Sequence, residues 1–232
     1  MVSTGKKELM IFQKRILGLL GFFLAPCAIG FGLLGDNSQI VDPKWWYSIS
    51  MTYYANSQIC MIGVLFSMAV LFLSYIGYNA SDKILTIISG ISALGIIVFP
   101  CGHGGIEITG LLGLECGTSF IIHCTFASLM FVSFAIMVGY NFTQTKGGDN
   151  MTPEKQLRNK IYYTCAGIIG VFMLNQVIAS VFGFPGYWTL INEAIMLWAF
   201  SFAWLVKAEF FECFNDKKAS PELNNVIKNE IA

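Results

Sequence analysis

Charged residues are scarce in this sequence. Asp, Glu, Lys and Arg make up only 12% of its 232 residues, whereas 55% are hydrophobic. Soluble domains carry about 25% charged residues, so this composition excludes an ordinary soluble protein. The formal net charge is zero, which gives no reason to expect a nucleic-acid partner. The chain is sized for a single membrane helical bundle over residues 1–232, with membrane lipid as its main partner.

Residues that hold common membrane cofactors are also few. The only histidines are His103 and His123, whereas intramembrane zinc hydrolases need about three and a two-haem cytochrome needs about four axial ligands. The seven cysteines contain no Cys-x-x-Cys pair, which argues against thiol redox sites and zinc ribbons. No apolar run contains a lysine for a retinal Schiff base. We therefore expect no metal and no cofactor, and these counts give an enzyme little support.

Long apolar runs are what the sequence does contain. A helix needs about 20 apolar residues to cross the hydrocarbon core of a bilayer, and six runs come close to or exceed that length. We therefore predict an all-α polytopic membrane protein with six transmembrane helices in one bundle, followed by a charged cytoplasmic tail over 208–232. The predicted spans are Ile16–Leu34, Ile59–Ile76, Ile84–Phe99, Thr118–Tyr140, Ile161–Phe182 and Trp188–Val206.

The basic residues fix the expected orientation. In a six-span arrangement, Lys44 is the only one of the 14 Lys and Arg residues that falls on the side opposite the two chain ends. Basic residues concentrate on the cytoplasmic side, so we predict a multi-pass protein with both termini in the cytoplasm. Thr152, Pro153 and Glu154 predict that the fifth helix begins in water well before its span. A proline after Ser220 predicts a short helix in the tail.

Small residues four positions apart predict close helix packing. Gly63 and Ser67 share one face of the second predicted span, and Ser89 and Ala93 share one face of the third. Such faces let a neighbouring helix approach closely. We interpret both pairs as packing surfaces without a chemical role.

An aromatic segment, Trp45–Tyr54, lies on the predicted outer side between the first two spans. Trp and Tyr are favoured at the membrane interface, so one interpretation is an interfacial helix leading into the second span. The other interpretation is that five polar side chains of this segment face inward and line the mouth of a cavity: Ser48, Ser50, Thr52, Tyr53 and Tyr54.

The second outer loop is rich in glycine and is bracketed by Cys101 and Cys116. A disulfide between them would stabilise the loop by about 3 kcal/mol in the chain-entropy model. Two separate thiols are the alternative, and the sequence leaves both open. The apolar centre, Ile106–Leu114, is too short to span the bilayer and suits a re-entrant turn.

Among the polar residues inside the last three predicted spans, we single out four as candidate site residues. Glu193 is the single formal charge in the last run, and a carboxylate within a span marks a functional site by default. At helical rise, His123 and Glu193 each lie about 8 Å below the outer interface, and Asn175 and Gln176 lie slightly deeper. These groups can therefore meet in an outward-facing pocket. The alternative is that they only join helices, because such contacts contribute about 0.6 kcal/mol each.

Several short motifs together resemble a known set of proteins. They are SISMTYY before the second span, Asp82 in a short turn, GISALG followed by FP, IHCTFA, TP followed by RNKIY, and EA followed by WLVK. This combination resembles uncharacterised bacterial six-helix integral membrane proteins that carry a domain of unknown function. The layout is more distantly similar to the DRAM and Sfk-type six-helix membrane proteins. The resemblance implies a six-helix architecture and a bacterial cell membrane location, and the Cys101–Cys116 loop departs from it. The matching positions are Ser48, Ser50, Tyr53, Tyr54, Pro100, His123 and Glu193.

These observations support three hypotheses of function. The first is a non-enzymatic protein that binds or moves an apolar or amphipathic, lipid-like ligand in an outward-facing pocket between spans four, five and six. The second is a membrane-embedded enzyme that acts on a lipid headgroup with His123 and Glu193, or Cys101 and His103, as an acid/base pair. The third is a structural or partner-binding membrane subunit. The sequence leaves the oligomeric state open.

Overall fold

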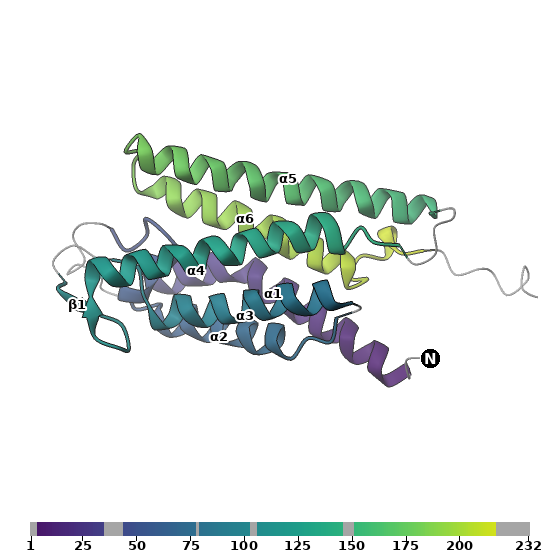
Figure 1. Cartoon of the computed structure of the whole chain (residues 1–232), viewed down its shortest axis with the longest axis horizontal. Coiled ribbons are helices and arrows are strands. Elements are labelled where there is room, and N and C mark those ends of the chain that lie inside the picture. The colour runs from purple at the N-terminus through teal and green to yellow at the C-terminus, as the bar shows by residue number, and fades with distance from the viewer. Residues whose placement is uncertain (1–3, 35–43, 78, 103–105, 146–150, 217–232) are drawn as a thin grey trace, which may run out of the picture.

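The chain folds into a bundle of six helices (Figure 1), seen in a computed structural model that describes residues 4–34, 44–77, 79–102, 106–145 and 151–216. The predicted all-α fold with six helices is confirmed. The predicted tail helix and His103 lie outside the described residues. The helices are α1 Thr4–Leu33, α2 Gln58–Leu73, α3 Ala80–Val98, α4 Cys116–Ile136, α5 Pro153–Val181 and α6 Tyr187–Lys207.

Shorter elements connect these helices. A 3-10 turn, η1 (Ser50–Tyr54), precedes α2, and an antiparallel hairpin of β1 (Ile108–Thr109) and β2 (Leu114–Glu115) precedes α4. The π turn η2 (Met137–Asn141) continues α4, and the 3-10 turn η3 (Glu212–Phe214) follows α6. The tip of the hairpin is exposed through apolar side chains, Ile108, Leu111 and Leu112, and the re-entrant turn expected for residues 106–114 stays a prediction.

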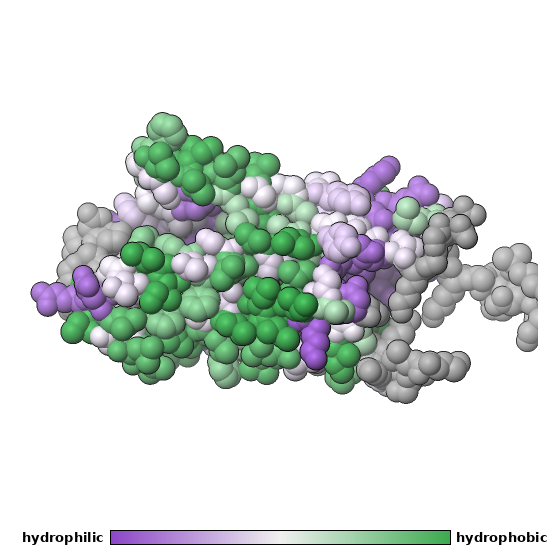
Figure 2. All heavy atoms as spheres, in the orientation of Figure 1, coloured by the Kyte–Doolittle hydropathy of each residue, from purple (hydrophilic) through white to green (hydrophobic). Residues whose placement is uncertain are grey.

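Five of the described helices are long and apolar enough to cross a membrane: α1, α3, α4 with η2, α5 and α6. The remaining helix, α2, is apolar but has only 16 residues, which is about 24 Å at 1.5 Å per residue. Large apolar side chains cover much of the outer surface, as Figure 2 shows for one face. This composition suits a bundle surrounded by lipid.

The helices are arranged in a closed ring. Each helix packs against the next one in the chain, and α6 packs back against α1. We name the two ends of the bundle by what they carry. The hairpin end carries η1, the β1–β2 hairpin and the turn between α5 and α6, and the terminal end carries the start of α1 and η3 (Figure 1). Both described ends of the chain therefore lie at the terminal end.

Aromatic side chains fill the centre of the ring. Phe134 of α4 stacks on Phe200 of α6 with ring centroids 3.6 Å apart, and both side chains are fully buried. Trp204 lies one turn after Phe200 and meets the edges of Phe72 and Phe142. Because residues four apart share a helix face, α6 presents a continuous aromatic stripe to the interior.

The packing prediction holds for α3 and fails for α2. Ser89 and Ala93 are fully buried, and the Ser89 hydroxyl lies 2.7 Å from that of Ser133 on α4. Gly63 and Ser67 are exposed instead, and no atom of another element lies within 4 Å of a Cβ built at Gly63. The prediction for α2 is wrong because the helix turns this face outward within the described structure.

Basic side chains gather at the terminal end. The ammonium groups of Lys155 and Lys207 both donate to the Phe142 carbonyl, at 3.0 and 3.2 Å. Arg15 donates to the Ala208 carbonyl at 3.1 Å, so it ties the first helix to the end of the last. The expected start of the fifth helix is also present, because the Thr152 hydroxyl caps α5 ahead of Pro153.

Candidate functional site

His123 lies on the inner face of α4, about two turns from the hairpin end, and only 4% of it is exposed. Its Nδ1 atom lies 2.8 Å from the Phe99 carbonyl oxygen. A carbonyl oxygen only accepts, so Nδ1 carries the proton and the neutral ring offers Nε2 as an acceptor. The Ser50 hydroxyl, 3.0 Å from Nε2, is therefore the donor.

Glu193 faces the same segment from α6. Its Oε2 atom accepts the backbone N–H of Ile49 at 2.7 Å, and the N–H of Ser50 also faces this carboxylate. Among the described residues, no hydrogen bond or ion pair joins Glu193 to His123 directly. The acid and the imidazole thus bond to adjacent residues of one segment, but they do not form the direct pair that the sequence suggested.

Gln176 belongs to a second group of contacts between α5 and α6. Its Nε2 atom donates to the Thr189 hydroxyl at 3.0 Å, and its Oε1 atom accepts from Asn192 Nδ2 at 2.7 Å. Asn192 is fully buried. Sequence reasoning missed Asn192 and Thr189. The signal that could have found Asn192 is its position, since a polar amide next to Glu193 within an apolar run marks a candidate site residue.

Together these contacts form a polar layer across the bundle near its hairpin end. We use this name for His123, Ser50, Glu193, Asn192, Gln176 and Thr189. The layer joins α4 to η1, η1 to α6, and α6 to α5. Buried polar groups in a low-dielectric setting hold elements in one arrangement when they are paired. Such a layer therefore fixes the hairpin end of the helices.

Two buried carboxamide oxygens in and beside the layer have no described partner. They are Oδ1 of Asn192, within the layer, and Oδ1 of Asn175, which neighbours Gln176 on α5. Both atoms are buried. Leaving a buried acceptor unpaired costs about 1–3 kcal/mol, so unpaired groups mark places where an additional donor would be stabilising. Asn175, unlike Gln176, is not joined to the polar layer by a described hydrogen bond.

Tyr54 lies beneath the hairpin, outside the polar layer. Its hydroxyl donates to the Cys101 carbonyl at 2.6 Å and lies 2.9 Å from the Thr109 hydroxyl. Burial raises the pKa of Tyr54 to about 12. Tyr53 packs edge-on against the Tyr54 ring. The hydroxyls of Ser50 and Tyr54 thus bond to groups inside the protein, while a cavity mouth lined by this segment stays a prediction.

The carbonyls that follow α3 are each bonded by a side chain. Phe99 is bonded by His123, Pro100 by the Ser119 hydroxyl at 2.8 Å, and Cys101 by Tyr54. Cys101 and Cys116 are separate thiols, which is the second alternative left by the sequence. Burial raises the pKa of the Cys101 thiol above its ordinary value, so this thiol is a poor nucleophile.

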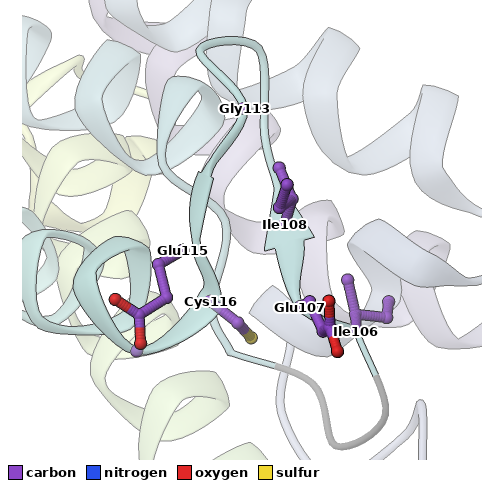
Figure 3. A pocket seen from close by; sticks show the side chains of 7 residues that line it. Ile106, Glu107, Ile108, Gly113, Glu115 and Cys116 are labelled. Carbon is purple, nitrogen blue, oxygen red and sulfur yellow. The ribbon is translucent and has the colours of Figure 1, made fainter.

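The hairpin carries a shallow cavity of about 560 Å³. Its lining includes Glu107, Glu115 and Cys116. Figure 3 shows that the Glu107 and Glu115 side chains lie on opposite sides of the hairpin. These carboxylates do not converge on one point. Among the described residues, no cluster of His, Cys, Asp or Glu has the geometry to hold a metal ion.

A second cavity, of about 210 Å³, lies between the end of α5 and the start of α6. Gln176 and Thr189 of the polar layer line it, together with Trp188 and Pro185. In Figure 2, the surface also recedes below the hairpin-end part of α5, and hydrophilic atoms are seen behind the apolar rim. The polar layer is thus close to space that a ligand can enter from the side of α5.

Fold and site define the class of this molecule as an all-α polytopic membrane bundle with a buried polar layer. In comparisons with protein-family models, curated proteins and solved structures, nothing matches the chain. The resemblance to bacterial six-helix proteins, and to the DRAM and Sfk-type proteins, therefore stays a prediction.

Proposed function

We propose that the protein binds or moves an amphipathic, lipid-like ligand at the hairpin end, between α4, α5 and α6. The observation that carries the proposal is the polar layer, with two unpaired acceptors in and beside it and a cavity next to Gln176. Ligand sites are typically apolar pockets with a few polar groups that fix orientation. A lipid-like molecule supplies apolar chains for the surrounding helices and a headgroup for the layer.

The packing of α5 supports a lateral entrance. Near the terminal end, α5 lies close to α4: Tyr162 meets the edge of Phe142, and a Cβ built at Gly139 lies 3.0 Å from that of Ala166. Near the hairpin end, the polar contacts of α5 are made to α6 instead, through Gln176. The two helices therefore diverge toward the hairpin end (Figure 1). A chain-bearing ligand in the bilayer can approach the layer by this route.

We place the hairpin end on the outer face of a bacterial cytoplasmic membrane, with both termini in the cytoplasm. The distribution of charge supports this orientation. Of the described Lys and Arg side chains, Lys44 alone belongs to the hairpin end, whereas Lys14, Arg15, Lys155 and Lys207 belong to the terminal end. The side of a membrane protein that carries most of its Lys and Arg residues lies in the cytoplasm.

Retention of lipid during purification tests the proposal. Wild type, Glu193→Gln and His123→Ala are purified in a mild detergent, washed equally, and their bound lipid is quantified by mass spectrometry. We expect both variants to retain less than half of the lipid that wild type retains. Glu115→Gln is the control, because it removes the same charge from an exposed position on the hairpin. Equal retention by all four proteins would refute the proposal.

The second candidate function is a membrane-embedded enzyme acting on a lipid. The observation that favours it is the 3.0 Å contact between the Ser50 hydroxyl and the accepting Nε2 atom of His123, because a nucleophile and its base stand at this distance. In such a reaction Ser50 Oγ attacks an ester carbonyl, its proton moves to Nε2, the alcohol leaves with that proton, and water then releases the acyl group. Labelling of Ser50 by a fluorophosphonate, absent in Ser50→Ala and His123→Ala, is the expected result, and no labelling of wild type argues against it.

A further inference from the structure

Within the polar layer, a buried carboxamide oxygen and a carboxylate lack a donor or cation, and this chemistry points to a particular kind of ligand. We infer that the lipid-like ligand carries a cationic, N–H-bearing headgroup, such as a primary ammonium, which pairs with Glu193. This inference rests on the proposed function and adds the chemical class of the headgroup. It is carried by three observations: the unpaired oxygens, the carboxylate without a cation, and the charge of the hairpin end.

The first observation concerns hydrogen bonding within the layer. The donor nitrogens of the layer, Nδ1 of His123, Nδ2 of Asn192 and Nε2 of Gln176, each have a described acceptor. Within the layer the atom left over is an oxygen, Oδ1 of Asn192, a residue with 0% exposure. Beside the layer, Oδ1 of Asn175 is a further buried oxygen without a described partner, although the nitrogen of that amide has no described acceptor either. An anionic headgroup would add further acceptors to this set. A headgroup that donates hydrogen bonds matches it.

The second observation concerns Glu193. Its Oε2 atom is held by the Ile49 N–H, but no Lys or Arg forms an ion pair with it in the part of the chain that the structure describes. The described ion pair, Arg158–Asp216, is at the opposite end of the bundle. His123 shares its ring nitrogens with Phe99 and Ser50, so it is not a counter-ion either. A carboxylate within a span normally pairs with an opposite charge.

The third observation is the charge of the hairpin end. Across the described ranges, this end carries the carboxylates of Glu107, Glu115 and Glu193 against the single ammonium of Lys44. The cationic side chains bonded at the terminal end are far from it, at the other end of the helices. An excess of negative charge raises the local concentration of cations and lowers that of anions. The approach to the layer therefore favours a cationic amphiphile.

Three matched fluorescent probes test the inference. Each probe has a dansyl group on a 12-carbon chain, and they differ only in a primary ammonium, hydroxyl or carboxylate head. Binding is titrated on the purified full chain in a non-ionic detergent at neutral pH. We expect the ammonium probe to bind at least tenfold more tightly than the other two. In Glu193→Gln, which retains an acceptor for the Ile49 N–H, we expect this preference to fall to within twofold.

Two further variants sharpen the result. Glu115→Gln makes the same charge change on the exposed hairpin, where it reduces only the general negative charge, and should therefore lower the preference far less than Glu193→Gln does. Asn175→Leu removes an unpaired acceptor without breaking a described hydrogen bond, and should weaken the ammonium probe at least threefold. Equal binding of all three probes to wild type, or a preference that survives in Glu193→Gln, would overturn the headgroup inference and leave the pocket intact. Failure of every probe to bind would overturn the proposed function as well.

Discussion

The Nε2 atom of His123 lies 3.0 Å from the hydroxyl of Ser50, a residue 73 positions earlier in the chain. The other nitrogen of the same ring is bonded to the Phe99 carbonyl just beyond the end of α3. One imidazole thus joins α4, η1 and the end of α3. Glu193 then extends this connection to α6 through the backbone of Ile49.

Replacement of His123 by alanine should destabilise the protein. The Phe99 carbonyl and the Ser50 hydroxyl would lose their partner in a buried setting, and an unpaired buried group costs about 1–3 kcal/mol. We expect a loss of that size in the free energy of unfolding, measured by denaturant titration in mixed micelles. The losses in unfolding free energy caused by Ser50→Ala and His123→Ala should not add in the double variant. The difference from additivity should be about 1 kcal/mol, because the two side chains share one hydrogen bond.

Ser67→Ala is the matched control for these serine and histidine variants. Ser67 is exposed and its hydroxyl bonds only to the Gly63 carbonyl of its own helix, so the change should stay within about 0.5 kcal/mol. Additive effects of Ser50→Ala and His123→Ala would contradict the coupling between them.

A methyl group added at Gly32 should also destabilise the bundle. A Cβ built there overlaps the ring of the buried Trp45, so the ring must move. Overpacking of this kind costs about 1–3 kcal/mol. Gly30 lies on the same helix with no atom of another element within 4 Å, and Gly30→Ala should be neutral or stabilising by up to about 1 kcal/mol. Thermal unfolding of the two variants checks the contrast, and equal melting temperatures would refute it.

Tyr54→Phe should loosen the hairpin without unfolding the bundle. The variant removes the donor to the Cys101 carbonyl and the partner of Thr109. We expect faster hydrogen exchange over residues 106–116 and unchanged exchange in α6, measured by mass spectrometry. Unchanged exchange in the hairpin would show that the Tyr54 hydroxyl does not hold it.

The same residue predicts a pH effect. Its pKa is raised to about 12 by burial, above the ordinary value of 10.0, so the folded state favours the protonated hydroxyl. This contribution to stability is fully present below pH 10 and is lost as the pH rises toward 12. Hydrogen exchange in the hairpin should be slower in wild type than in Tyr54→Phe below pH 10. This difference between the two proteins should therefore disappear as the pH rises from 10 to 12.

Asp216 predicts an effect at the opposite end of the pH scale. Hydrogen bonds from the Thr152 hydroxyl and the Arg158 guanidinium lower the pKa of this carboxyl below its ordinary value of 3.8. The stabilisation is present at neutral pH and is lost as the pH falls through the lowered pKa. Since Asp216 is half-exposed, Asp216→Asn should cost less than about 1 kcal/mol at pH 7. Stability curves of the two proteins should converge as the pH falls below 3.8 and through the lowered pKa.

Thiol labelling tests the predicted orientation. Cys213 is exposed at the terminal end, and Glu115→Cys places a thiol on the exposed hairpin. Each is studied alone in a cysteine-free background, with a membrane-impermeant maleimide added to intact cells. We expect labelling at position 115 and none at Cys213 until the cells are lysed. The reverse pattern would place the termini outside.

Much of the architecture followed from local properties. Apolar runs of bilayer length predicted all six helices, and Thr152 with Pro153 predicted the early start of α5. Such signals are readable because a helix satisfies its own backbone hydrogen bonds, so length and hydropathy largely decide whether it forms. The sequence did not tell which face of α2 turns inward, since Gly63 and Ser67 have the spacing of a packing surface and yet are exposed.

The sequence by itself determined that six apolar helices would form and which residues within them were polar. Only the tertiary structure decided which of those polar groups meet. His123 and Glu193 do not pair directly but are both bonded to the segment containing Ile49 and Ser50. Asn192 enters the layer, while Asn175 has no described partner for its oxygen. The physical reason is that depth along a helix can be counted along the chain, whereas rotation about its axis is set by packing between elements distant in sequence.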